Sequence, residues 1–141
     1  MLPFHIYTEQ RGPRLYQLDD GRFQIIEKGD LGPFMSGYGY VLADRDLADF
    51  LEQLDAERVT FKDAVVWDRT SNAEYTTYRQ ILINQHFSHD QIRDLNIEGT
   101  RMLMMGNEYP FVSPMLKHRL ENSQFTYLRF SEGLSGFAGQ I

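Results

Sequence analysis

The sequence contains no cysteine. This absence excludes disulfides, thiolate nucleophiles and cysteine-ligated zinc. The chain also has no apolar run near the roughly 20 residues that span a bilayer, so we expect no membrane insertion. Residues 1–10 do not combine a basic segment with a long apolar run, and so do not fit a secretory signal. We therefore expect a cytoplasmic protein.

Basic residues are in the minority, because 14 Lys and Arg stand against 20 Asp and Glu for a net charge of −6. General nucleic-acid binding depends on basic patches, so this balance argues against it. An acidic surface is instead compatible with a basic protein partner, since opposite charge speeds encounter. The 141 residues, 42% of them hydrophobic, suffice for one domain with its own core.

Strand and hairpin patterns outnumber crossover units along the chain. The segment Asp19-Asp20-Gly21 predicts a hairpin turn within residues 4–27, and Gly106-Asn107 predicts another turn between strands at 100–105 and 109–112. Further strands are expected at 38–43, at 59–67 and at 78–83. This order predicts an α+β fold: a single domain over 1–130 with a mixed, mainly antiparallel sheet and about three helices packed on it. Residues 131–141 are expected to form a flexible tail.

Capping patterns predict where the helices begin. Asp44 precedes an apolar stripe at helical spacing, made of Leu47, Phe50, Leu51 and Leu54. Ser88 and Gln91 are spaced as a capping box for a short helix that ends near residue 96. Ser113-Pro114 opens a third helix. After that helix, the alternation in Phe125–Phe130 predicts a return strand.

Two surfaces are candidates for binding a partner. The first is the acidic outer face of the helix after Asp44, carrying Asp49, Glu52 and Asp55. The second is a rim around the polar loop 68–73, next to Trp67, and consists of Asp68, Arg69, Tyr75 and Tyr78. Tyrosine joins a large apolar body to a polar tip and is enriched at interfaces. The competing interpretations are a solvated helix face and a rim whose aromatics belong to the core.

No residue pattern predicts catalysis, a metal site or a cofactor. His86 and His89 form an H-x-x-H pair that straddles a helix start, so they are interpreted as surface histidines. The glycine-rich segment 29–39 matches neither phosphate-loop fingerprint and is interpreted as a connecting loop. Ser88 and Ser113 are explained as helix caps and lie outside the G-x-S-x-G context of a nucleophile.

Residues from about Tyr38 to Phe130 resemble small immunity proteins of bacterial polymorphic toxin systems, the antitoxins paired with contact-dependent and type VI secretion effectors. The resemblance is carried by an apolar strand ending in Val112-Ser113, a helix with Leu116 and Leu120, and the segment Phe125–Phe130, preceded by Trp67, Tyr75, Tyr78 and Ile81. It implies a non-enzymatic protein that occludes the active or substrate surface of a cognate protein toxin. The alternative is a small-ligand-binding module or small enzyme that uses segment 29–39 with a histidine.

Overall fold

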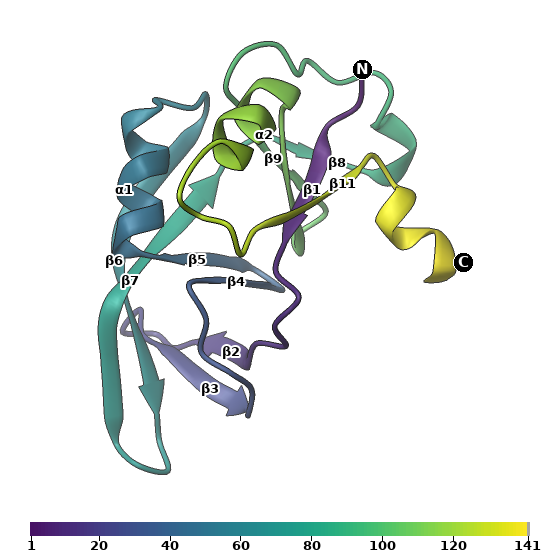
Figure 1. Cartoon of the computed structure of the whole chain (residues 1–141). Coiled ribbons are helices and arrows are strands. Elements are labelled where there is room, and N and C mark those ends of the chain that lie inside the picture. Colours follow the sequence, from purple (N-terminus) through teal and green to yellow (C-terminus); the bar gives the residue numbers. More distant parts are fainter. Residues whose placement is uncertain (141) are drawn as a thin grey trace.

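A computed structural model describes residues 1–140, and it divides the strands between two sheets (Figure 1). The smaller sheet has the order β11-β1-β10-β9-β8. Its strands are β1 (Phe4–Tyr7), β8 (His86–Phe87), β9 (Met102–Met105), β10 (Tyr109–Val112) and β11 (Arg129–Glu132). The larger sheet has the order β2-β3-β6-β7-β5-β4. Its strands are β2 (Arg14–Gln17), β3 (Phe23–Glu27), β4 (Phe34–Gly37), β5 (Tyr40–Asp44), β6 (Val59–Asp68) and β7 (Ala73–Ile83).

The α+β class is confirmed in its coarse form, with strands dominating. The prediction of one sheet with about three helices is wrong. Residues 1–140 form two sheets and two α-helices, α1 (Arg45–Gln53) and α2 (Pro114–Glu121). The helix predicted after Ser88 is one 3-10 turn, His89–Gln91, although its capping box is present. Ile92 and Leu95 supply apolar spacing for one turn only, and so short a helix is marginal without more burial.

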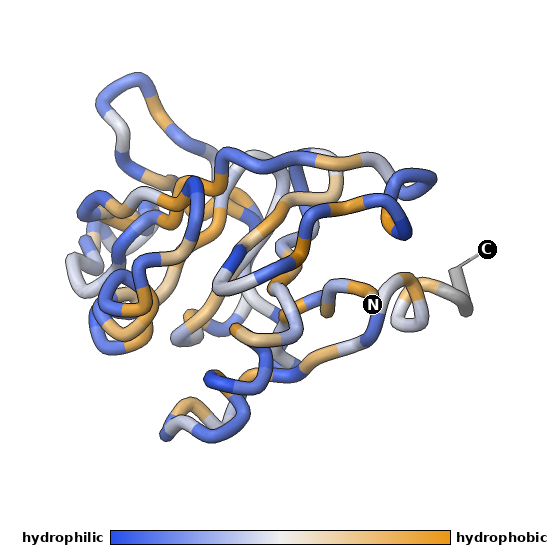
Figure 2. Tube along the Cα trace, turned by 90° about the horizontal axis from the view of Figure 1, so that it is seen from above, coloured by the Kyte–Doolittle hydropathy of each residue, from blue (hydrophilic) through white to orange (hydrophobic). Residues whose placement is uncertain are grey.

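The main core lies where the two sheets and both helices meet. Buried side chains come from β7 and β9 and from the inner faces of α1 and α2, and include Ile81, Ile83, Met102, Met104, Leu47, Leu51, Leu116 and Leu120. In Figure 2, hydrophilic residues lie along several of the outlying loops. A second core cluster, around Phe23, Tyr40 and Val66, belongs to the larger sheet alone.

Helix α1 begins and packs as its sequence predicts. The backbone N–H of Leu47 donates to Asp44 Oδ1 at 3.0 Å, which satisfies one of the unpaired donors of the first turn. Leu47 and Leu51 are fully buried, so the apolar stripe faces the core.

Helix α2 begins at a serine that binds three backbone groups. Ser113 Oγ accepts from the N–H of Leu116 at 3.4 Å and from that of Arg101 at 3.0 Å, and it donates to the Gly99 carbonyl at 2.7 Å. The predicted cap is therefore confirmed, and the same hydroxyl ties the helix to the loop before β9. Asn122 is the C-cap residue of α2.

The return strand predicted at Phe125–Phe130 is wrong in its bounds, because β11 begins only at Arg129. Phe125 and Leu128 are both buried, and the N–H of Leu128 donates to the Phe125 carbonyl at 3.3 Å. Two buried residues three positions apart fit a turn, whereas a strand alternates with period two. The segment thus forms a turn that delivers the chain to the edge of the smaller sheet beside β1.

Two further segments differ from their predictions. The glycine-rich segment 29–39 contains strand β4, which pairs with β5 through a tight turn at Gly39, where φ is +83°. Strand β7 begins at Ala73, well before the predicted start at 78. At Thr76-Thr77 it contains a bulge, since Ala64 opposes Tyr78 whereas Val66 opposes Tyr75.

The segment predicted to be a flexible tail contains the end of β11 and a 3-10 turn, Ser135–Gln140. The ring of Phe137 lies 4.9 Å from that of His5 and 5.0 Å from that of Tyr109, measured between ring centroids. Its flexibility stays a prediction, and Ile141 lies outside the described residues. Among residues 1–140, no helix combines the length and the apolar character needed to cross a bilayer.

Candidate partner-binding surface

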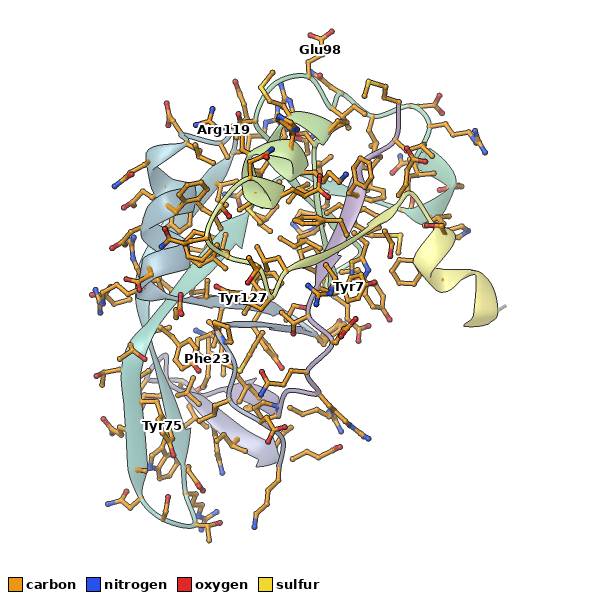
Figure 3. The ribbon with its side chains drawn as sticks, viewed as in Figure 1. Tyr7, Phe23, Tyr75, Glu98, Arg119 and Tyr127 are labelled. Atoms are coloured by element: carbon orange, nitrogen blue, oxygen red, sulfur yellow. The ribbon has the colours of Figure 1, made fainter. Side chains whose placement is uncertain are left out.

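The β6–β7 hairpin extends beyond both helices and ends at loop 69–72, away from the smaller sheet (Figure 1). We call this part of the larger sheet, with the neighbouring strands β2 and β3, the distal end. Figure 3 shows the Tyr75 side chain on the hairpin, below the Phe23 side chain. No helix covers the hairpin there in Figure 1.

The inner face of the distal end contains an open depression with both apolar and charged side chains in its lining. It is lined by Ile25, Ile26, Glu27, Lys28, Gly29, Leu31, Asp68, Thr70 and Tyr75. Ile25 and Leu31 pack on the second core cluster, so the floor of the depression is continuous with the core. Tyr75 is 38% exposed and Ile26 is 50% exposed, so both present apolar surface to solvent.

Two bulges place these side chains together. In the β2–β3 pair, Arg14 opposes Glu27 while Leu15 opposes Ile25, which leaves Ile26 as an extra residue without a partner. In the β6–β7 pair, the bulge at Thr76-Thr77 places Tyr75 opposite Val66, on the inner face. Bulges redirect side chains without ending the sheet, so residues that simple alternation would separate share one depression.

The outer face of the distal end carries an aromatic–cation cluster. The Arg22 guanidinium lies 4.4 Å from the centre of the Trp67 ring, and it also binds Glu74 at 3.3 Å and Asp20 at 2.9 Å. The backbone N–H and guanidinium of Arg22 hold the pKa of Asp20 below its usual value. One guanidinium thus binds two carboxylates, and the three groups together keep one net negative charge.

Three of the four predicted rim residues lie together. Asp68 Oδ1 accepts from the N–H of Thr70 at 3.0 Å and shapes the loop, while Arg69 and Tyr75 are exposed. Tyr78 does not belong to this surface, because it is 6% exposed and its hydroxyl donates to the Gly32 carbonyl at 2.9 Å. Burial raises the pKa of the Tyr78 phenol, which stays a neutral donor.

The acidic face of α1 is less free than its sequence predicts. Arg79, from β7, is 13% exposed and binds Asp49 at 2.8 Å and Glu52 at 3.0 Å. The hydrogen bonds from Arg79 hold the pKa of Glu52 below its usual value. Asp55 lies past the end of the helix and takes no part in this network among the described residues. The face is therefore mixed in charge, and Arg79 was missed because its cation comes from a distant strand.

The two histidines of the H-x-x-H pair lie in different elements, His86 in β8 and His89 in a 3-10 turn. Among residues 1–140, no group of three or more potential ligands is placed to hold an ion. His86 Nδ1 donates to the Gly106 carbonyl at 3.0 Å, and His89 starts the 3-10 turn. One element of the alternative function is nevertheless present, since Gly39 from the glycine-rich segment and His86 line a common pocket.

Sequence reasoning missed the isoleucines and Leu31 as part of the distal surface. The adjacent pair Ile25-Ile26 could have indicated this surface. Side chains of a strand alternate between its two faces, so two neighbouring apolar residues cannot both face the core unless the strand bulges. Comparisons with family models, with curated proteins and with solved structures give no match.

Proposed function

We propose that this chain is an immunity protein that binds a cognate bacterial toxin through the distal end of its larger sheet. The observation that supports this proposal is the open depression beside Tyr75 and Ile26, in which exposed apolar side chains lie among charged ones on a floor continuous with the core. Exposed apolar surface rimmed by polar groups is typical of a protein-binding site. Tyrosine at such a site supplies a rigid anchor with a polar tip.

The mechanism we propose is occlusion. The projecting β6–β7 hairpin offers a narrow edge that enters or covers a concave surface of the toxin, and the floor of the depression receives an apolar side chain of the toxin in return. Asp68, Glu27 and Lys28 also line the depression and give it charges of both signs, so they select an orientation. The net charge of −6 favours a basic toxin surface and speeds its approach.

Pull-down from the native host with the purified chain tests the proposal. Tyr75→Ala should weaken capture of the toxin by about 2 kcal/mol or more, chiefly through faster dissociation, because an interface anchor is lost. The matched control is Met115→Ala, which removes another exposed apolar side chain, on α2. Equal binding by the wild type and Tyr75→Ala, or recovery of no protein partner, would contradict the assignment.

A second candidate, small-ligand binding, is supported by a different observation. Gly39 and His86 lie at one pocket with the buried carboxamide of Gln80, whose oxygen has no hydrogen-bond partner among the described residues. This pocket shares no lining residue with the distal depression. The two candidate functions can therefore be tested separately.

A further inference from the structure

Asp68 brings a half-buried carboxylate to the lining of the distal depression. Its Oδ1 accepts a hydrogen bond from the N–H of Thr70 at 3.0 Å, which fixes the side chain at the end of β6. Among residues 1–140, no lysine, arginine or histidine forms an ion pair with this carboxylate. The depression therefore contains an oriented anion to which the chain supplies no cation.

An aromatic ring and an aliphatic side chain flank this carboxylate. Val66 opposes Tyr75 on β7 and Phe23 on the parallel strand β3. Two residues further along β6, Asp68 lies on the same face of the sheet, diagonal to Tyr75 and beside Ile25. Diagonal neighbours in a sheet are about 7–8 Å apart, within reach of an aromatic side chain. A group bound to the carboxylate thus meets the tyrosine ring on one side and apolar surface on the other.

The other two charged side chains of the depression have different properties. Glu27 already binds Arg14 at 3.1 Å. Lys28 is exposed and has a long flexible stem, so its ammonium can stay in solvent when a partner covers the depression. Asp68 is short and tied to Thr70, and covering a carboxylate without a cation costs free energy. A partner that covers the depression must therefore bring a cation to Asp68.

The opposite face of the same hairpin shows which cation suits such a pair. There the Arg22 guanidinium lies 4.4 Å from the centre of the Trp67 ring and binds Glu74 at 3.3 Å. An aromatic ring and a neighbouring carboxylate thus bind one arginine, which stacks on the ring and forms an ion pair at the same time. The inner face repeats this combination with Tyr75 and Asp68, in the depression that is open to a partner.

Arginine fits the inner face better than lysine does. Its planar guanidinium stacks on an aromatic ring and donates in a fixed geometry, whereas the lysine ammonium is a compact, strongly hydrated charge. The methylene stem of arginine covers apolar surface, which Ile25 and Leu31 provide in the depression. Arginine is also enriched at protein interfaces, and lysine is depleted.

We propose that the distal depression binds an arginine side chain of the toxin. The guanidinium donates to Asp68 Oδ2 and stacks on the Tyr75 ring, and the stem lies on Ile25 and Leu31. This stem is the apolar group that the floor of the depression receives. The inference rests on the proposed immunity function, to which it adds the chemistry of the partner residue.

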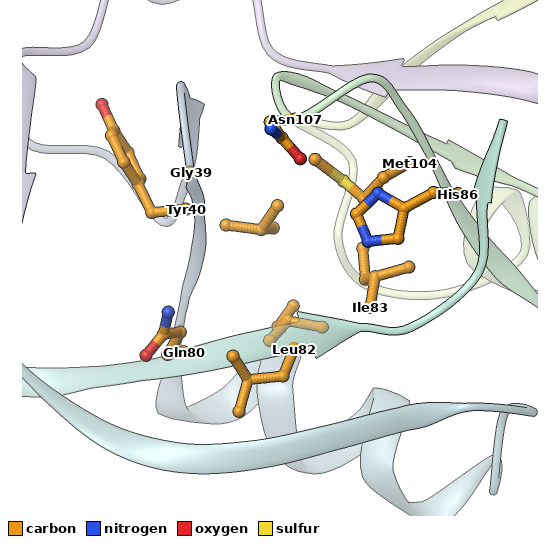
Figure 4. A pocket seen from close by; sticks show the side chains of 10 residues that line it. Gly39, Tyr40, Gln80, Leu82, Ile83, His86, Met104 and Asn107 are labelled. Atoms are coloured by element: carbon orange, nitrogen blue, oxygen red, sulfur yellow. The ribbon is translucent and has the colours of Figure 1, made fainter. Parts of the chain in front are cut away.

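The test is a titration of the full chain with N-acetylargininamide, followed through methyl NMR signals. The signals of Ile25 and Ile26, which line the depression, should shift. Met104 lines the separate pocket between the two sheets (Figure 4), so its signal is the internal control and should not shift. N-acetylcitrullinamide has nearly the same shape without the charge, and it should bind about tenfold more weakly, because a charge-assisted hydrogen bond is lost. N-acetyllysinamide, which has the charge without the plane, should also bind more weakly.

A pair of variants with equal net charge isolates the carboxylate. Asp68→Asn keeps an acceptor for the N–H of Thr70 but removes the charge, so the tenfold preference for arginine over citrulline should disappear. Asp55→Asn removes the same charge past the end of α1, outside the depression, and should keep the preference. Tyr75→Ala should weaken binding of the arginine probe, since the stacking ring is lost.

The outcomes separate this inference from the immunity assignment. Unshifted Ile25 and Ile26 signals at tens of millimolar probe, or equal affinity for the arginine and citrulline probes, would overturn the inference. So would a lysine probe that binds as tightly as the arginine probe. A toxin whose capture depends on Tyr75 but is unchanged by Asp68→Asn would overturn the inference and leave the immunity assignment in place. Binding of the arginine probe at Asp68 without capture of any toxin would support the arginine site and contradict the immunity assignment.

Discussion

The same two strands, β6 and β7, pass through two very different environments. Toward the helices, Ile81 and Ile83 lie in the main core beneath α1 and against the smaller sheet. At the distal end, Tyr75 and its neighbour Ile26 line an open depression. The first region holds the fold together, and the second contains apolar surface that the chain itself does not bury. The difference teaches that the distal apolar residues are not explained by folding and need another role.

The strongest test of this contrast is a pair of truncations. Leu51→Ala removes a fully buried side chain of α1 and should lower the free energy of unfolding by about 2–5 kcal/mol, through lost transfer energy and the cavity left behind. Ile26→Ala at the distal end should change it by no more than about 0.5 kcal/mol. Urea denaturation of both variants measures the difference. Similar losses for the two variants would show that the distal end is part of the core.

A smaller effect is expected at the α2 cap. Ser113→Ala removes the acceptor for Leu116 and Arg101 and the donor to Gly99, so the free energy of unfolding should fall by about 2 kcal/mol. For comparison at the distal end, Asp68→Ala removes one loop hydrogen bond, from the N–H of Thr70. It should lower the free energy of unfolding by less than half as much. Loss of toxin binding in a stably folded Ser113→Ala variant would reopen a functional role for this serine.

Acid should lower the free energy of unfolding through His5, which lies in β1 of the smaller sheet. Burial among aromatic rings lowers the pKa of His5 to about 4, against an ordinary value of 6.5. The folded chain keeps this ring neutral, whereas the unfolded chain protonates it at about pH 6.5. Its contribution to stability is therefore complete above pH 6.5, declines as the pH falls toward 4, and changes no further below. His5→Phe should remove this part of the denaturation profile, and His89→Phe, at an exposed site, should leave it in place.

The smallest effect is expected for ion pairs of exposed carboxylates, because solvent and salt screen them. Glu52→Gln breaks the bidentate contact with Arg79 on the helix side, and Glu74→Gln breaks the contact with Arg22 at the distal end. Neither variant should move the urea midpoint much. For toxin binding the two should differ, because Glu74 lies beside the proposed interface. If only Glu52→Gln slowed association with the toxin at low salt, the toxin would bind at α1 and not at the distal end.

Local signals predicted the parts of the fold that local physics decides. Asp44, with its apolar stripe, was sufficient to predict α1, and Asp20-Gly21 predicted the β2–β3 turn. The burial of Tyr78 agrees with the competing interpretation, in which aromatic residues of the rim belong to the core, whereas the bulge at Thr76-Thr77, which decides the residues that share a face, was not predicted. Pairing of Arg79 with the helix carboxylates depends on how β7 lies under α1, which no nearby residue encodes.

Strand β1 pairs on one side with β10 and on the other with β11, so Ile6 faces Phe130 across the smaller sheet. The larger sheet, by contrast, is made entirely from residues 14–83. Closing a loop of more than a hundred residues is slow and costs entropy, whereas hairpins such as β6–β7 close locally. During synthesis the larger sheet can therefore assemble while β1 still lacks both of its partners. The order of folding then follows from the order of the strands: the projecting hairpin forms early, and the smaller sheet completes only when β11 arrives.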